Sequence, residues 1–343
     1  MSRRRVVRLP GTTPAVDLLS LGRVGPSGRL SPAQIHQIQR IVRRVPEVMV
    51  KVTSGGTKMG AVAAHFSYIS RKGEFAIEND EGERIIGRDA QKDLLNDWHL
   101  ELSAGQYRAP REGRTTARRT KLVHNIVLSM PSPTPPEKVL AAARDFGRET
   151  FGHQHRYAMV LHADQKPPHV HMVVKAESEH GQRLHIDKEM LRKWRKDFAR
   201  MMREQGVAAN ATTRVLRGKN KWKTKDRMYR AQLRGASDAN RNRVNDIVAE
   251  LKANRTINDP ARNRLIETRK AVVSAWMRTA EQLEAEGEVA LGLEVRYFAR
   301  HLPPVLTDKE LLAVQLLQHV RAQRAPSLDA NENTLQRDRE RTR

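Results

Sequence analysis

The 343-residue sequence contains no cysteine. Disulfide bonds, thiolate zinc sites, iron–sulfur clusters and a thiol nucleophile are therefore excluded, and a reducing, cytoplasmic environment is expected. No apolar run approaches the ~20 residues that a membrane-spanning helix needs, so we expect no membrane insertion. The basic N-terminus is not followed by an apolar stretch, so we expect no secretory signal.

Acidic residues are scarce relative to basic ones: 39 Asp and Glu stand against 63 Lys and Arg, a net charge of +24. The excess lies in three blocks, residues 1–45 (net +8), 108–121 (net +5) and 188–235 (net +12), and the rest of the chain is close to neutral. Concentrated positive charge releases counterions when it meets phosphate. This distribution predicts a nucleic-acid partner rather than an evenly solvated basic surface.

Composition shifts along the chain predict five segments. Short strands joined by both hairpins and helices indicate that residues 47–206 form an α+β domain with a mainly antiparallel sheet and flanking helices. The segments are a basic arm with a short helix (1–46), the α+β domain (47–206), a basic linker (207–237), an α-helical region (238–324) and a disordered Arg-rich tail (325–343).

Apolar periodicity and turn residues predict the elements of the α+β domain. We expect Thr57 to cap the N-terminus of its first helix. The strands are expected at 49–52, 74–78, 84–87, 122–130, 157–163, 169–176 and 183–186, and the helices at 58–71, 89–102, 135–151 and 187–205.

Eight of the thirteen histidines fall between residues 124 and 185, and the densest stretch is a predicted hairpin. Strand side chains alternate faces, so His162 and Asp164 share one face, as do His169 and His171. With residues 165–168 as the loop, Asp164 is expected opposite His169, and His162 opposite His171. Three imidazoles on one patch can hold a divalent cation, with Asp164 fixing a histidine tautomer. Surface histidines on an ordinary strand pair are the alternative.

Tyr68 is a candidate nucleophile on the helix expected at 58–71. The apolar stripe of this helix is formed by Val62, Phe66 and Ile69. At ~100° per residue, Tyr68 points more than a right angle away from that stripe, which leaves its phenol available to a ligand. An exposed tyrosine without a catalytic role is the alternative.

The segment Tyr68-Ile69-Ser70-Arg71-Lys72-Gly73, followed much later by His-x-Asp-x-x-x-Pro-His-x-His from residue 162, resembles the relaxases of conjugative and mobilisable plasmids. These are the tyrosine HUH endonucleases, and the pattern is closest to the T-DNA border endonuclease type. The resemblance covers roughly residues 47–205. It implies an HUH relaxase fold. The strand expected at 122–130 stands where that family has its middle motif, and there His124 and Ser129 are expected on opposite faces.

The resemblance implies that the protein cuts one DNA strand at the nic site of an origin of transfer. Tyr68 would become joined to the 5′ phosphate, while His162, His169 and His171 would hold Mg²⁺ or Mn²⁺ and Asp164 would complete the catalytic set. A cation on the scissile phosphate offsets transition-state charge and so compensates for the poor nucleophilicity of a protonated tyrosine. The residue that takes the tyrosine proton stays open.

Basic residues interleaved with aromatic ones suit single-stranded DNA. We expect DNA contacts from Arg71, Lys72, Lys219, Lys221, Trp222, Lys223 and Lys225. The resemblance also implies relaxosome accessory proteins and a type IV coupling protein as partners, with transfer of the protein into the recipient cell alongside the DNA. The Arg-rich tail resembles the signals that lead such proteins to a type IV secretion system.

Three other functions are compatible with parts of the pattern. A plasmid replication initiator of the HUH type would share the metal site and the tyrosine. A non-catalytic DNA-binding accessory protein would need only the charge, and a water-using metal nuclease would cut without becoming attached to DNA. The presence of both motifs in the expected order favours the relaxase.

Overall fold

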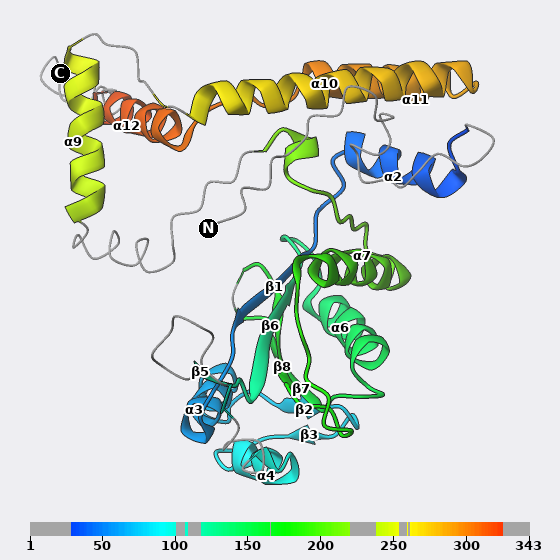
Figure 1. Cartoon of the computed structure of the whole chain (residues 1–343), viewed down its shortest axis with the longest axis vertical. Coiled ribbons are helices and arrows are strands. Elements are labelled where there is room, and N and C mark those ends of the chain that lie inside the picture. The colour runs from blue at the N-terminus through cyan, green and yellow to red at the C-terminus, as the bar shows by residue number, and fades with distance from the viewer. Residues whose placement is uncertain are drawn as a thin grey trace, which may run out of the picture. The chain divides into compact units, whose positions relative to one another are not determined.

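The computed structural model describes residues 29–100, 107–108, 118–164, 166–219, 238–253, 259 and 261–324. They fall into two compact units (Figure 1). One lies within residues 39–212, and the other combines residues before 39 with residues from 213 onward.

A six-stranded sheet forms the centre of the first unit. Its order is β1-β6-β8-β7-β2-β3, and every neighbouring pair is antiparallel. The predicted α+β class with an antiparallel sheet is therefore confirmed. The strands are β1 (Met49–Ser54), β2 (Ile77–Asn79), β3 (Arg84–Ile85), β6 (Val123–Ser129), β7 (Tyr157–His162) and β8 (His169–Lys175), and a separate pair is formed by β4 (Tyr107–Arg108) and β5 (Arg118–Arg119).

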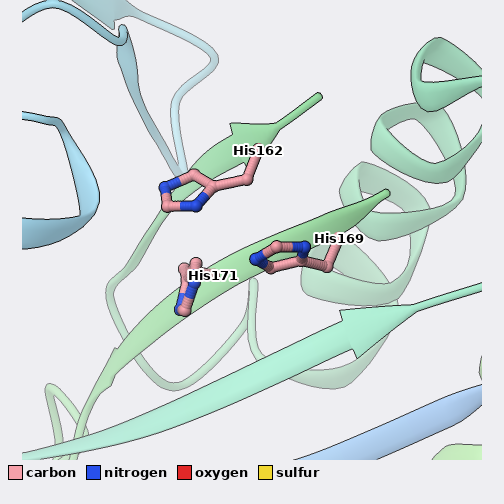
Figure 2. Close-up of side chains that lie close together, drawn as sticks. All are labelled: His162, His169 and His171. Carbon is pink, nitrogen blue, oxygen red and sulfur yellow. The ribbon is translucent and has the colours of Figure 1, made fainter. Parts of the chain in front are cut away.

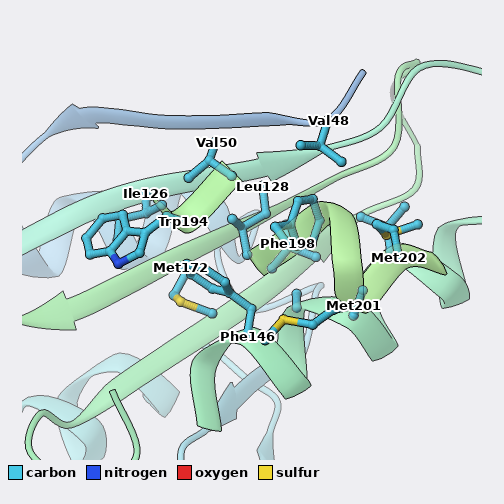
Figure 3. Packing of buried hydrophobic residues seen from close by; sticks show 14 of the residues in the cluster. Val48, Val50, Ile126, Leu128, Phe146, Met172, Trp194, Phe198, Met201 and Met202 are labelled. Atoms are coloured by element: carbon cyan, nitrogen blue, oxygen red, sulfur yellow. The ribbon is translucent and has the colours of Figure 1, made fainter. Parts of the chain in front are cut away.

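Helices α6 (Pro136–Thr150) and α7 (Lys188–Glu204) cover one face of the sheet (Figure 1). Phe146 of α6 makes edge contacts with Trp194 and Phe198 of α7, at ring-centroid distances of 6.0 and 6.1 Å. These rings pack with alternate strand residues such as Leu128 and Met172 (Figure 3). Burying one such side chain contributes about 1.5–3 kcal/mol, so this layer stabilises the first unit.

Helices α3 (Met59–Ile69) and α4 (Ala90–Asp97) belong to the core on the other face. The predicted stripe of α3 is fully buried there: Val62, Phe66 and Ile69 pack in one cluster with Val160 of β7 and Val173 of β8. Because side chains alternate along β8, the odd-numbered residues that face α3 include His169 and His171. The fold thus brings the Tyr68 helix to the histidine face of the sheet.

Three local predictions are wrong. Residues 183–186 do not form a strand, and Arg183 instead pairs with Glu177 in an isolated bridge. The helix expected at 89–102 ends at Asp97, and His99 has a left-handed φ of 45°, which cannot continue a helix. Lys58, not Thr57, is the N-cap of α3, and it makes no side-chain capping bond.

The second unit is helical, as predicted for residues 238–324. Its elements are η1 (Val215–Arg217), α9 (Asp238–Lys252), α10 (Ala261–Ala285), α11 (Val289–Arg300) and α12 (Asp308–Arg324). Trp276 of α10 is buried and donates its indole N–H to the Leu216 carbonyl, which ties η1 to this unit. Pro303 and Pro304 separate α11 from α12, since proline cannot continue a helix.

Helix α2 (Pro32–Val42) is the short helix predicted within residues 1–46. The backbone N–H of Ser31 donates to the Gln34 side chain at 2.8 Å, and the Gln34 N–H donates to Ser31 Oγ at 3.3 Å, which is a capping box. Among the helices that the structure describes, none is long and apolar enough to span a bilayer.

Candidate metal centre and nucleophile helix

The β7–β8 hairpin places three histidines on one face of the sheet. His162 lies directly opposite His169, and His171 lies opposite Val160. The predicted pairing of His162 with His171 and of Asp164 with His169 is therefore wrong, because β7 ends at His162 and the connection is longer than predicted. The error is a shift of two residues, and an even shift leaves every side chain on its original face.

The three imidazoles converge on one point. One ring nitrogen from each of His162, His169 and His171 can be chosen so that all three atoms lie within 4.8 Å of one another. The ring centroids are 4.6–5.0 Å apart, and the rings are turned toward one another (Figure 2). This spacing suits three nitrogen ligands of a single cation.

Backbone carbonyls fix two of these rings. The Nε2–H of His162 donates to the Ile69 carbonyl at 2.7 Å, and the Nδ1–H of His169 donates to the Pro167 carbonyl at 2.9 Å. The unprotonated atoms are then Nδ1 of His162 and Nε2 of His169. A metal-ligating histidine typically donates its other ring N–H to such an acceptor, so the donor set fits a divalent metal.

The surroundings of His162 and His171 favour their neutral forms. Burial lowers the pKa of His162, and burial together with the neighbouring histidines lowers the pKa of His171 to about 3. A metal binds the neutral form of imidazole, because a proton on the ligand nitrogen would compete with the ion.

Tyr68 stands on the last turn of α3, one residue before the Ile69 carbonyl that bonds His162. Its side chain is 63% exposed, and the carbonyl of the next residue, Ile69, accepts the His162 hydrogen bond. The Arg71 guanidinium lies 5.7 Å from the centre of the Tyr68 ring, within cation–π range. The helix end that presents the phenol is thus bonded to the histidine hairpin.

A left-handed turn follows α3. Arg71, Lys72 and Gly73 have φ values of 52°, 58° and 93°. This conformation costs about 1–2 kcal/mol at each non-glycine residue. Glycine is required at 73, since an added Cβ would lie 2.3 Å from the carbonyl carbon of Gly87.

The turn directs Arg71 toward the end of β7. Its Nη2 pairs with Asp164 Oδ2 at 3.4 Å, and the two side chains are 25% and 41% exposed. Asp164 was predicted to orient a histidine. In the structure its carboxylate accepts from Arg71, while the carbonyls of Ile69 and Pro167 accept from the histidines.

Strand β6 places His124 and Ser129 on opposite faces of the sheet, as predicted. Ser129 lies opposite His169 on the metal face and is 2% exposed. His124 pairs with Val174 on the α6–α7 face, and burial, with Lys121 nearby, lowers its pKa to about 4.

The predicted DNA-binding residues divide between described and undescribed parts of the chain. Lys72 and Lys219 are exposed, and Arg71 is partly buried by its contacts with Tyr68 and Asp164. Lys221, Trp222, Lys223 and Lys225 lie outside the described residues, as does the Arg-rich tail.

Two features of the site were not predicted from the sequence. One is the Arg71–Asp164 pair, whose members are 93 residues apart. The other is His65, whose ring lies 6.3 Å from that of His171. Its place one helical turn before Tyr68 is the only signal that sequence offered.

Comparison with known families identifies this arrangement. Residues 68–207, from Tyr68 through the histidine hairpin to the end of α7, match the family model "Relaxase: MobA/VirD2-like, nuclease domain". These residues form a MobA/VirD2-like relaxase nuclease domain. The resemblance drawn from the two motifs is thereby confirmed for this part of the chain.

Two curated relatives show what the relaxase domain is similar to. The chain is 28% identical over 199 residues to the T-DNA border endonuclease VirD2 of Rhizobium radiobacter, covering 52% of this chain and 43% of that protein. It is 28% identical over 144 residues to VirD2 of Rhizobium rhizogenes, covering 40% and 30%. The similarity thus spans less than half the length of these relatives.

One solved chain, described as "Molecular Basis of Vancomycin Resistance Transfer in Staphylococcus aureus", is 12% identical, with a TM-score of 0.32. The match covers 49% of this chain and 99% of that one.

Proposed function

We propose that this protein is a plasmid relaxase that nicks one DNA strand at an origin of transfer and becomes attached through Tyr68 to the 5′ phosphate. The observation that carries the proposal is the 2.7 Å hydrogen bond from His162 to the Ile69 carbonyl. It fixes the end of the tyrosine helix against the three-histidine site. A nucleophile and a site for phosphate-bound metal are then parts of one assembly.

Tyr68 is the attacking group. Its phenolic oxygen forms a bond to phosphorus, the bond from phosphorus to the 3′ oxygen breaks, and the departing oxygen gains a proton as the phenol loses one. The products are a 5′-phosphotyrosine and a free 3′ hydroxyl. Attack by that hydroxyl on the phosphotyrosine reverses the reaction and rejoins the strand, which a transfer cycle requires.

His162, His169 and His171 would hold the metal, and the hydrogen bonds leave Nδ1 of His162 and Nε2 of His169 unprotonated for it. We propose Mg²⁺ or Mn²⁺, which supplies positive charge that neutralises the phosphate oxygens when bound. The carbonyls of Ile69 and Pro167 hold the two rings in the tautomers that leave these atoms free.

Arg71 stabilises negative charge on the Tyr68 oxygen, since its guanidinium lies beside the phenol ring. Asp164 is a positioning residue in this scheme. Its carboxylate accepts from Arg71 and holds the guanidinium between the tyrosine and the end of β7. The link between Asp164 and the nucleophile therefore passes through Arg71.

The DNA partner is single-stranded or locally melted, because basic residues interleaved with an aromatic side chain suit single strands. Lys72 and Lys219, with the linker residues Lys221, Trp222, Lys223 and Lys225, supply phosphate contacts and base stacking. We also propose relaxosome accessory proteins and a type IV coupling protein as partners, and action in the cytoplasm before transfer into the recipient with the DNA.

A denaturing gel tests the proposal. The full chain is incubated with Mn²⁺ and single-stranded oligonucleotides that tile the DNA beside its gene, each labelled at either the 3′ or the 5′ end. A 3′ label should move to protein-plus-DNA mass, and a 5′ label should appear in a shorter, free fragment. Tyr68→Phe should give neither product. Tyr297→Phe is a matched control, since Tyr297 is similarly exposed, at 66%.

Each contrary outcome supports a different function. Free fragments without a protein-linked band indicate a water-using nuclease. Binding without either product indicates a non-catalytic DNA-binding protein. Attachment within a replication origin instead of an origin of transfer indicates a replication initiator.

A further inference from the structure

His65 lies on α3 between the sheet-facing stripe and the nucleophile. At ~100° per residue, it stands ~40–60° around the helix from Val62 and Ile69, and Tyr68 stands a further ~60° beyond it. Its ring meets that of His171 at a centroid distance of 6.3 Å and an interplanar angle of 75°. Edge-to-face contacts of this kind are favoured between aromatic rings because their edges and faces carry opposite partial charge.

The Nε2 atom of His65 is buried and has no hydrogen-bond partner among the residues that the structure describes. A buried polar atom without a partner costs free energy, and such atoms are rare in folded proteins. An apolar side chain of similar size at position 65 would avoid that cost. Stability alone therefore does not explain a histidine here.

His171 differs from the two other histidines of the metal site. The carbonyls of Ile69 and Pro167 fix His162 and His169, whereas within the described structure no hydrogen bond fixes the ring of His171. Its ring contacts are with His162, His169 and His65. Of these three rings, only that of His65 comes from outside the metal site.

His65 is not a fourth ligand in this arrangement. The three nitrogens that lie within 4.8 Å of one another come from His162, His169 and His171, and His65 does not join that group. We propose that His65 is the positioning residue of the metal site, and that its ring edge holds the His171 imidazole with one nitrogen turned toward the other two ligands. This inference rests on the metal site proposed above.

The first measurement is thermal unfolding of the full chain without metal. His65→Leu removes the unpaired nitrogen and keeps a side chain of similar volume, so its Tm should equal or exceed that of the wild type. His153→Leu is the matched control, because His153 is exposed and lies outside the site. A marked fall in Tm for His65→Leu alone would show that His65 is a structural residue and would overturn the proposal.

The second measurement is Mn²⁺ affinity of the same proteins by isothermal titration calorimetry. His65→Leu should bind Mn²⁺ about 10- to 100-fold more weakly, the usual cost of losing a group that orients a ligand. His65→Phe keeps a ring edge against His171 and should bind more tightly than His65→Leu. Equal affinity in the wild type and His65→Leu would refute the inference but leave the metal site intact. A wild type that binds no Mn²⁺ would refute both.

Pulsed electron paramagnetic resonance of bound Mn²⁺ separates positioning from ligation. The spectra should show three imidazole nitrogens in the wild type and the same number in His65→Leu at saturating Mn²⁺. Four in the wild type and three in the variant would make His65 a ligand and overturn its positioning role.

Discussion

Neutralising Asp164 should slow DNA attachment much more than it destabilises the protein. The Arg71–Asp164 pair is partly exposed and its atoms are 3.4 Å apart, so it contributes about 0.2–1 kcal/mol to folding. Tm falls by ~2–4 °C per kcal/mol in a domain of ~150–250 residues, so Asp164→Asn should lower Tm by less than ~4 °C.

The rate of adduct formation depends on how strongly Arg71 stabilises negative charge on the Tyr68 oxygen. A cation beside an aromatic ring is worth about 0.5–2 kcal/mol, and each ~1.4 kcal/mol changes a rate tenfold. Arg71→Gln should therefore slow adduct formation by about 2- to 30-fold, and Asp164→Asn by no more than this. Single-turnover gel assays at saturating Mn²⁺ measure both rates.

A double-mutant cycle decides whether the two residues act together. If Asp164 works through Arg71, the double variant should be no slower than Arg71→Gln alone, because the second change removes nothing further. Asp89→Asn, which breaks the exposed pair with Lys92 on α4, should leave the rate unchanged. Additive losses from Arg71→Gln and Asp164→Asn would refute the reasoning.

Three further outcomes are expected. Phe146→Ala should lower the free energy of unfolding by about 3–5 kcal/mol in urea titrations, because it empties a site against two rings of α7, and Mn²⁺ affinity of the folded variant should be unchanged. Gly73→Ala should lower Tm and slow adduct formation, because its Cβ would collide with Gly87; equal Tm and rate would show that the turn adapts freely. EDTA should abolish adduct formation and excess Mn²⁺ should restore it, whereas an EDTA-resistant reaction would exclude a metal requirement.

Sequence patterns predicted faces better than pairings. Alternation along β7 and β8 placed His162, His169 and His171 together, and the structure confirms their shared face. The register was off by two residues because it depends on where β7 ends, and alternation does not define that point. Composition also marked the helical region of the second unit, because its Ala-, Leu- and Glu-rich segments form helices with few competing local structures.

Contacts between distant segments could not be predicted. The Ile69 carbonyl that fixes His162 is 93 residues away in the chain, and a backbone acceptor leaves no trace in the residue type. Asp164 was recognised through its motif, but its partner Arg71 depends on a left-handed turn that a non-glycine residue rarely adopts. His65 stands outside both motifs, and only packing against His171 reveals it.

Peptide mapping of the trapped adduct tests the central claim most directly. The protein–DNA product is digested with nuclease and trypsin, and the modified peptide is sequenced by mass spectrometry. A nucleotide phosphate should be found on Tyr68, within the tryptic peptide from Met59 to Arg71, which contains no other tyrosine. Attachment to any other residue would contradict the assignment of Tyr68 as the nucleophile.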